Sequence, residues 1–213
     1  MAPDRSTRPY RKRKRAEQEE ETRRRITEAA MELHGTVVPA NTRIADVARL
    51  AGVSRMTVYN HFPTEGDLFT ACSSHWSSLN PFPDPGPWKD IVDPAERLRR
   101  ALEELYAWYA LHERGMLGQV LRDMPVVPAL AEVMEGLWGS WSEEVVGVLA
   151  SGWSPPGAED ERALLAALRL ATDFGTWRVL SGSGLDAERA AGLVGRMVVE
   201  AVGSTDEVTA PRR

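Results

Sequence analysis

Two short helical patterns joined by a single glycine restrict the folds open to this sequence more than any other feature. Apolar residues recur on one helix face across residues 44–51, and Gly52 then suits the left-handed turn that ends a helix. Ser54 is a good N-cap for the helix that follows, in which Val58 and Phe62 lie one turn apart and face inward. The spacing therefore predicts a helix-turn-helix.

The second helix of this pair is polar on its outer side. Six of its residues must largely face solvent, namely Arg55, Met56, Thr57, Tyr59, Asn60 and His61. A helix that reads the major groove of DNA needs hydrogen-bond donors and acceptors, together with a few apolar groups for the thymine methyl. The simpler alternative is a surface helix whose polar residues bind nothing. The helix caps, the glycine turn and nearby basic residues together favour DNA recognition.

The rest of the chain is also predicted to be helical. Apolar residues within 26–33 repeat at helical spacing, in a helix that should begin near Gln18 and end before Gly35. Thr42 is a suitable N-cap for the first helix of the pair. From residue 76 onward, proline and glycine separate five further helices. The predicted fold class is all-α, with an N-terminal three-helix helix-turn-helix domain followed by a larger helical domain.

The net charge of −5 hides a division along the chain. Residues 1–62 hold 13 Lys and Arg against 8 Asp and Glu, a balance of +5, whereas residues 63–213 hold 13 against 23, a balance of −10. Residues 1–16, called the basic arm below, are the most cationic part and are predicted to be disordered without a partner. The basic arm is either a solvated tail or a segment that lies on phosphates or in a minor groove.

The sequence lacks the marks of several other classes of protein. No apolar run reaches the roughly 18 residues of a membrane-spanning helix, and no secretory signal is present, so a cytoplasmic location away from membranes is expected. The single cysteine, Cys72, excludes an internal disulfide, and the four histidines are too scattered for a metal site. Without a glycine-rich phosphate loop or a nucleophile elbow, neither catalytic residues nor a cofactor is expected.

In the region of the glycine turn, the sequence resembles the TetR-type transcriptional regulators. The stretch "TRIADVARLAGVSRMTVYNHFPTEGDLF" matches that family's DNA-binding signature without a gap, and the resemblance covers about residues 18–75. The resemblance implies DNA contacts from Thr42, Arg43, Ser54, Arg55, Met56, Thr57, Tyr59, Asn60 and His61. Within this set, Arg55, Met56 and Asn60 would vary with the sequence of the operator.

Two departures from the family pattern concern the loop after the first helix and the start of the fourth. The family usually has an aromatic residue in the first helix and a Gly-aromatic pair in the loop, whereas this chain has His34, then Val38 and Pro39. The loop is therefore expected to take a different path. Glu65 stands where the family often has Lys or Arg to hold a phosphate. A capping box formed by Thr64 and the Asp67 that follows it should still start the fourth helix there.

The region beyond residue 76 is rich in aromatic residues, and all seven Trp lie beyond residue 63. Most of these side chains are expected to form ordinary core. A pocket between helices could also collect several of them and bind a small apolar or aromatic effector. The candidate effector-binding residues are Tyr106, Tyr109, Met116, Met134, Trp138, Trp141, Phe174 and Trp177.

Small residues mark the last two predicted helices, residues 159–180 and 186–202. Small faces let helices approach closely, either within one subunit or between two. The resembled family pairs its last two long helices with those of a second subunit, which favours a dimer interface. The candidate interface residues are Ala167, Ala171, Gly175, Ala190, Val194, Met197, Val198 and Ala201.

These patterns divide the chain into the basic arm (1–16), a DNA-binding domain (17–75, with its helix-turn-helix at 43–62) and an effector-binding and dimerisation domain (76–213). The predicted function is a homodimeric repressor that leaves a palindromic double-stranded DNA operator when a small effector binds. One alternative is a regulator whose C-terminal domain only dimerises or binds another protein. An enzyme is a third and much weaker alternative.

Overall fold

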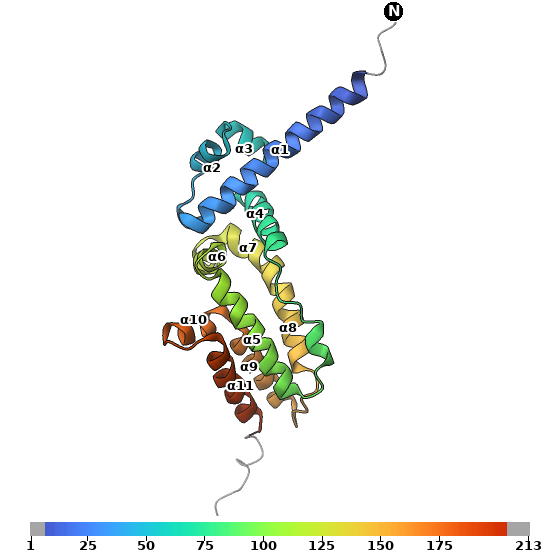
Figure 1. The fold of residues 1–213 in the computed structure, drawn as a ribbon, viewed down its shortest axis with the longest axis vertical. Coiled ribbons are helices and arrows are strands. Elements are labelled where there is room, and N and C mark those ends of the chain that lie inside the picture. Colours follow the sequence, from blue (N-terminus) through green and yellow to red (C-terminus); the bar gives the residue numbers. More distant parts are fainter. Residues whose placement is uncertain (1–6, 204–213) are drawn as a thin grey trace, which may run out of the picture. The chain divides into compact units, whose positions relative to one another are not determined.

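The computed structural model describes residues 7–203 and contains helices joined by turns and loops, without a strand in that range (Figure 1). The predicted all-α fold class is therefore confirmed. The α-helices are α1 (Thr7–Thr36), α2 (Ile44–Ala51), α3 (Arg55–His61), α4 (Glu65–Leu79), α5 (Pro94–His112), α6 (Met116–Asp123), α7 (Pro128–Met134), α8 (Ser140–Ala150), α9 (Ala158–Thr172), α10 (Phe174–Gly182) and α11 (Ala187–Gly203). None of these helices is long and apolar enough to cross a membrane.

The helices form two compact units. Within residues 7–203, unit 1 comprises the residues up to Pro81 together with Arg114–Met134, and unit 2 comprises Phe82–Glu113 together with the residues from Glu135 onward. This division differs from the single boundary predicted after residue 75. The reason is tertiary: α6 packs against α1 and α7 packs against α4, so both helices share the core of unit 1.

Helix α1 begins much earlier than the sequence pattern predicts. The helix was expected near Gln18, after a disordered basic arm, but it starts at Thr7 and continues without a break to Thr36. Residues 1–6 of the basic arm lie outside the described residues. Arg, Lys, Glu and Gln are good helix formers, and ion pairs one turn apart join Arg13 to Glu17 (2.8 Å) and Arg15 to Glu19 (2.9 Å). Local helix propensity therefore outweighs the repulsion between the basic side chains.

The turn between α2 and α3 forms as its residues predict. Gly52 has a φ of 66°, in the left-handed region, and the Ser54 hydroxyl accepts a hydrogen bond from the Thr57 N–H at 3.0 Å. Val58 is buried on the inner side of α3. The N-cap of α2 was predicted wrongly: it is Arg43, whose side chain makes no capping hydrogen bond. The Thr42 hydroxyl instead donates to the Val38 carbonyl oxygen at 2.8 Å.

The capping box at the start of α4 is confirmed. The Thr64 Oγ1 accepts a hydrogen bond from the Asp67 N–H at 3.1 Å, and the Asp67 carboxylate accepts one from the Thr64 N–H at 3.0 Å. The hydrogen bonds from Thr64 hold the pKa of Asp67 below its usual value. α4 therefore begins where the sequence predicts, with its first amides already partly occupied.

His34 is a core residue of unit 1. Its ring lies 5.1 Å from the Phe69 ring, and its Nδ1 is 3.3 Å from the Cys72 Sγ. Burial lowers the pKa of His34 to about 4 and raises the pKa of the Cys72 thiol to about 12. The neutral imidazole thus packs as a core side chain beside Phe69 and Cys72.

The buried imidazole makes the stability of unit 1 depend on pH. In the unfolded chain His34 binds a proton below about pH 6.5, whereas in the folded chain it stays neutral down to about pH 4. The folded state should therefore lose up to about 3 kcal/mol of stability as the pH falls from 6.5 to 4. Thermal unfolding at pH 7.5 and pH 5 should show a smaller difference for His34→Phe than for the wild type. An equal difference would mean that His34 is protonated in the folded state.

Unit 2 is built around α5, which packs against α8, α9 and α11. Two tyrosines of α5 are fully buried and bonded to the end of α9: the Tyr106 hydroxyl donates to the Ala171 carbonyl and the Tyr109 hydroxyl to the Thr172 carbonyl, both at 2.7 Å. Between residues 76 and 203 the structure has seven α-helices, α5 to α11, rather than the five predicted. The π-helical turn η4 (Glu135–Gly139) separates α7 from α8, and Asp173 separates α9 from α10. The spacing of apolar residues predicts one continuous helix in each of these two places.

Candidate functional site

Helix α3 presents a continuous polar and aromatic face to solvent. Met56 is 68% exposed and Tyr59 is 45% exposed, and Arg55 and Asn60 are exposed beside them. Thr57 and His61 are half-buried at the edges of this face. Val58 and Phe62 are buried on the opposite side and hold α3 against the core of unit 1. The outer face therefore combines donors, acceptors and an apolar group in one short helix, as a major-groove reader requires.

Three of the predicted DNA-binding hydroxyls already have partners inside unit 1. The Ser54 hydroxyl caps α3 and lies 2.8 Å from the Thr57 hydroxyl, so one of these two hydroxyls donates a hydrogen bond to the other. The Thr42 hydroxyl donates its only proton to Val38, and the Thr42 N–H donates to the Pro39 carbonyl at 3.1 Å. Phosphate oxygens only accept hydrogen bonds. In this conformation Thr42 therefore has no free donor for a phosphate.

Two arginines of α1 anchor the C-terminal ends of the helix pair. The Arg25 guanidinium donates to the Ala51 carbonyl at the end of α2 (3.1 Å), and the Arg23 guanidinium donates to the His61 carbonyl at the end of α3 (2.9 Å). Arg23 also lies over the Phe62 ring, 4.3 Å from its centroid. A cation at a helix C-terminus stabilises the carbonyls that have no partner within the helix. Both helices are thus attached to α1 by charge as well as by packing.

The sequence contains no signal that identifies these two anchors. Arg23, Arg24 and Arg25 each have a glutamate three or four residues away. Only Arg24 uses its neighbours, with ion pairs to Glu21 at 2.7 Å and Glu28 at 2.6 Å. Spacing alone therefore could not separate the paired arginine from the two that reach other helices.

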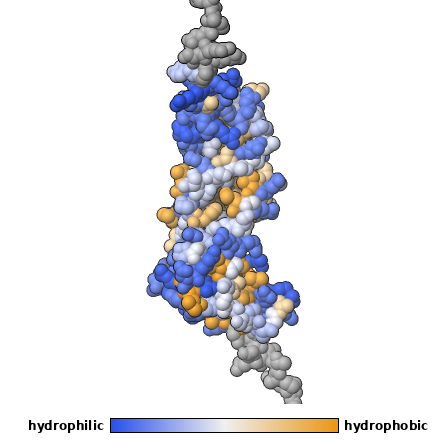
Figure 2. Space-filling view, turned by 90° about the vertical axis from the view of Figure 1, so that its right-hand side faces the viewer, coloured by the Kyte–Doolittle hydropathy of each residue, from blue (hydrophilic) through white to orange (hydrophobic). Residues whose placement is uncertain are grey.

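The basic end of α1 is exposed. Arg11, Lys12 and Lys14 face solvent, and the ion-paired side chains of Arg13 and Arg15 remain about 80% exposed. Such surface pairs are weak, so a phosphate could replace the glutamate partner. Hydrophilic side chains cover this end of the molecule in the space-filling view (Figure 2). At the start of α4, by contrast, Glu65 is exposed and Asp67 occupies the cap, which places negative charge where a phosphate would lie.

The predicted effector-binding residues divide between the two units. Met116 and Met134 are buried in unit 1. The remaining six belong to a network of ring contacts in unit 2. In this network the centroid of the Trp138 ring lies 6.2 Å from that of Tyr109 and 5.3 Å from that of Trp141. Phe82 and Trp108 extend this network and were not predicted as part of it. Trp138 lies within the π-helical turn η4, a feature often found at functional sites.

The predicted dimer interface is partly a core. Ala171, Ala190, Val194 and Val198 are buried within unit 2, where α11 packs against α5 and α9, so these four residues were assigned wrongly to a surface. Ala167 is half-buried, and Gly175, Met197 and Ala201 are exposed. Leu170 and Val179, on α9 and α10, are also exposed. Small residues at helical spacing suit either role, and here half of the eight predicted interface residues belong to the interior of unit 2.

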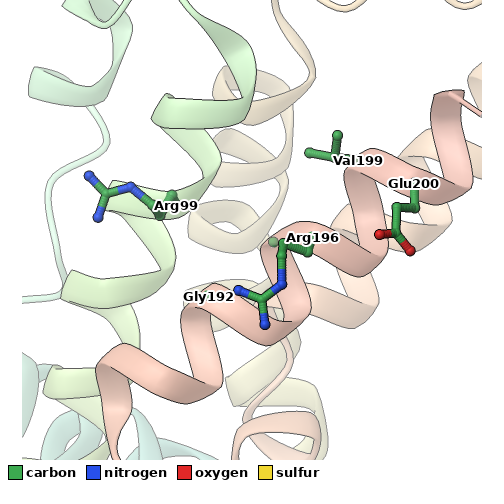
Figure 3. Close-up of a pocket in the computed structure, with 6 residues that line it drawn as sticks. Arg99, Gly192, Arg196, Val199 and Glu200 are labelled. Atoms are coloured by element: carbon green, nitrogen blue, oxygen red, sulfur yellow. The ribbon is translucent and has the colours of Figure 1, made fainter.

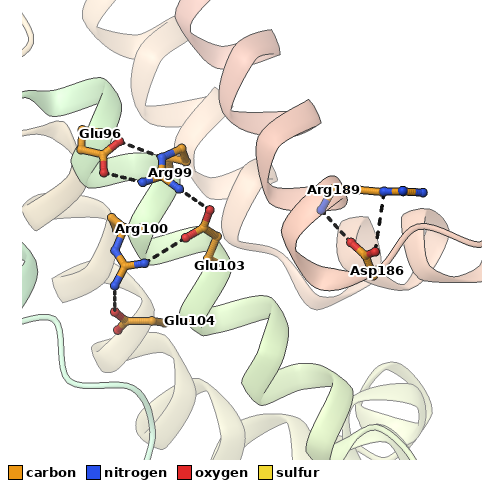
Figure 4. Close-up of polar contacts among 7 residues, drawn as sticks. All are labelled: Glu96, Arg99, Arg100, Glu103, Glu104, Asp186 and Arg189. Carbon is orange, nitrogen blue, oxygen red and sulfur yellow. Dashed lines mark hydrogen bonds and ion pairs between the residues drawn. The ribbon is translucent and has the colours of Figure 1, made fainter.

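A groove of about 240 Å³ runs between α5 and α11 (Figure 3). Gly192, Gly195 and Val199 line it, with the charged side chains of Arg99 and Arg196 beside them. Figure 4 shows how glutamates hold two arginines of α5: Arg99 is paired with Glu96 and Glu103, and Arg100 with Glu103 and Glu104. At the start of α11, the Asp186 carboxylate accepts a hydrogen bond from the Arg189 N–H at 2.9 Å.

Comparison with known proteins finds relatives of the helix-turn-helix region and of the whole fold. Residues 26–72 match the family model described as "Bacterial regulatory proteins, tetR family". No curated protein matches the sequence. The chain is similar in fold to a TetR-like transcriptional regulator from Rhodococcus sp. RHA1 (TM-score 0.57, 20% identity, 86% of this chain and 97% of that one). It is also similar to NalD, the secondary repressor of the MexAB-OprM multidrug efflux pump in Pseudomonas aeruginosa (TM-score 0.56, 20% identity, 87% and 98%). A third similar structure is a candidate transcriptional regulator from Saccharomonospora viridis in complex with choline (TM-score 0.52, 21% identity, 87% and 97%).

Proposed function

Because the chain carries the DNA-binding domain of the tetR family of bacterial regulatory proteins, we propose that it is a homodimeric repressor that a small effector releases from a palindromic operator. The observation that carries the proposal is α3: a capped helix after a glycine turn, with Arg55, Met56, Tyr59 and Asn60 on its exposed face. Selection of bound sequences from a pool of random duplexes tests it. Enrichment of one inverted repeat is expected, and a pool that stays random would contradict the proposal.

The exposed side chains divide into two kinds of DNA contact. Arg55, Met56, Tyr59 and Asn60 lie on the outer face of α3 and would reach base edges in the major groove. Arg43, at the start of α2, and Ser54, Thr57 and His61, at the edges of α3, would contact phosphates. Thr42 would contribute only after its hydroxyl leaves Val38, which makes it the weakest member of the predicted set.

The dimer is proposed to use the exposed apolar residues of α9 to α11. Leu170, Val179 and Met197 are large apolar side chains in solvent, and Gly175 and Ala201 allow close approach beside them. A two-fold axis would place this surface against the same surface of the second subunit. Two α3 helices held about 34–36 Å apart would then enter successive major grooves of one operator.

An apolar or aromatic effector is proposed for the aromatic network of unit 2. Phe82, Trp108, Trp138 and Trp141 are only partly buried, so their rings remain accessible to a ligand. The similar protein from Saccharomonospora viridis holds choline, a cation that aromatic rings bind well. The alternative is a regulator without an inducer, whose unit 2 only dimerises or binds a protein. A metabolite that raises the melting temperature and releases operator DNA would favour the first reading, and failure of a broad panel would favour the second.

The basic end of α1 should contribute affinity that depends strongly on salt. Log affinity falls as log salt rises, and replacing Lys12 and Lys14 with glutamine should make this fall shallower by about 3 to 4 in slope. Each lost phosphate contact is worth about 0.9, and a dimer carries both lysines twice. Arg162→Gln with Arg189→Gln is a matched control, which removes two exposed cations from unit 2. Equal slopes in all three proteins would show that the basic arm does not touch DNA.

A further inference from the structure

The turn between α1 and α2 has an unusual backbone. Val38 has φ 77° and ψ 149°, and among residues 7–203 it is the only residue other than glycine with a positive φ. This region of φ and ψ is essentially reserved for glycine, because a β-branched side chain collides with the backbone there. Val38 leads directly into the short 3-10 helix η1 (Pro39–Asn41). Contacts from outside the turn must therefore hold it in place.

A buried carboxylate from another part of the chain supplies one such contact. Oδ2 of Asp123, the last residue of α6, accepts a hydrogen bond from the Ala40 N–H at 2.9 Å. Asp123 is only 7% exposed, and its other oxygen lies 3.7 Å from the Arg122 Nε. A carboxylate is a stronger acceptor than a neutral group, particularly when it is shielded from water. The Ala40 amide lies in the first turn of η1, where a helix has no internal acceptor for it.

The start of α2 lacks a side-chain cap of its own. η1 ends at Asn41, and α2 begins at Ile44 with Arg43 as an N-cap that makes no side-chain hydrogen bond. The far ends of α2 and α3 are anchored by Arg25 and Arg23. The near end of α2 packs on α1 through the buried Val47 but has no such arginine anchor, and the turn before it is held by the buried Pro39 and by the hydrogen bond from Ala40 to Asp123.

We propose that Asp123 is a positioning residue for DNA binding, whose carboxylate holds η1 through Ala40 and so sets where the helix pair α2–α3 lies on α1. The inference rests on the proposed function, since it concerns how α3 is presented to an operator. Asp123 does not itself touch DNA. Without the carboxylate, the strained Val38 turn relaxes and α2 moves, so that only a fraction of molecules present α3 correctly.

The effect should be confined to specific binding. Asp123→Ala should weaken affinity for the selected operator about tenfold or more, because apparent affinity falls with the fraction of molecules in the competent conformation. Affinity for a random duplex and its salt dependence should stay unchanged, because no phosphate contact is lost. Asp123→Asn keeps an acceptor oxygen for the Ala40 amide and should lose less. Glu132→Ala is the matched control, since it removes an exposed carboxylate from α7 in the same unit.

A rescue experiment separates positioning from general destabilisation. Glycine adopts the Val38 conformation without strain, so Val38→Gly should restore most of the operator affinity that Asp123→Ala loses. A merely structural loss would not be recovered, because glycine adds no packing. Wild-type operator affinity in Asp123→Ala, or a double variant no better than Asp123→Ala, would overturn the proposal.

Hydrogen exchange distinguishes failure of this inference from failure of the proposed function. If the wild type selects no DNA sequence, the proposed function fails, but the contact can still be tested on the protein alone. Asp123→Ala should then exchange the amides of η1 and the first turn of α2 faster than the wild type, while the amides of α4 keep their protection. Unchanged exchange in η1 and α2 would overturn the role of Asp123 independently of any DNA measurement.

Discussion

Replacement of Tyr59 by alanine is expected to lower affinity for the selected operator by about 30-fold to 10⁴-fold. A direct contact with DNA bases is worth about 1–3 kcal/mol, and a homodimer loses it at both half-sites, so the total is about 2–6 kcal/mol. The fold should survive, because Tyr59 is 45% exposed on the outer face of α3 and lies outside the core of unit 1. Titration of labelled operator measures the loss, and circular dichroism checks that the helices remain.

Two further variants determine what Tyr59 contributes. Tyr59→Phe keeps the ring and removes the hydroxyl, so it separates stacking on a thymine methyl from a hydrogen bond. Leu111→Ala removes a large exposed side chain from α5 and should leave affinity unchanged. Wild-type affinity in Tyr59→Ala would mean that the exposed face of α3 does not face DNA.

A charge introduced at Met197 is expected to split the dimer and to reduce operator affinity by 100-fold or more. Met197 is 58% exposed on α11, so Met197→Arg should leave unit 2 folded. At a two-fold interface the new charge is duplicated and faces its own copy or an apolar surface. Loss of the linkage between half-sites removes an effective concentration in the millimolar range, and each half-site alone binds weakly.

Two control variants, one in unit 2 and one on α11 itself, test whether the effect of Met197→Arg comes from the dimer interface. Val92→Arg places the same charge at an 88% exposed position of unit 2 and should change neither mass nor affinity. Val194→Arg, one turn before Met197 in α11, buries an unpaired charge and should instead unfold unit 2. Sedimentation and operator titration are read together. A monomeric Met197→Arg protein that binds the full operator normally would contradict the dimer mechanism, whereas an intact dimer would contradict only this choice of surface.

The parts of the fold that the sequence predicts are those set by local chemistry. Gly52, Ser54 and the Thr64–Asp67 box each act within a few residues, and each forms as predicted. The start of α1 was missed because a run of like charges suggests disorder, although Arg, Lys and Glu at helical spacing also favour a helix. The N-cap of α2 was missed because the Thr42 hydroxyl bonds to Val38 in a turn of unpredicted shape.

The remaining errors concern contacts between segments far apart in the chain. Periodicity says that Ala190, Val194 and Val198 share a face, but it does not say whether that face meets α5 or another subunit. The same limit applies to Met116 and Met134, whose helices belong to unit 1 despite their place in the sequence. The roles of Arg23, Arg25 and Asp123 are of this kind too, since each side chain reaches a backbone atom at least 26 residues away.

Because α1 runs unbroken from Thr7 to Thr36, residues 7–16 of the basic arm have a fixed direction around the helix axis. One residue inserted near Ala16 would turn the basic end by about 100° about the helix axis and move it outward by about 1.5 Å. Seven inserted residues would return it to within about 20° of its original direction, some 10 Å further out. The direction in which these cations point therefore depends on the number of residues that separate them from the rest of α1. A flexible tail of the same composition would tolerate either insertion.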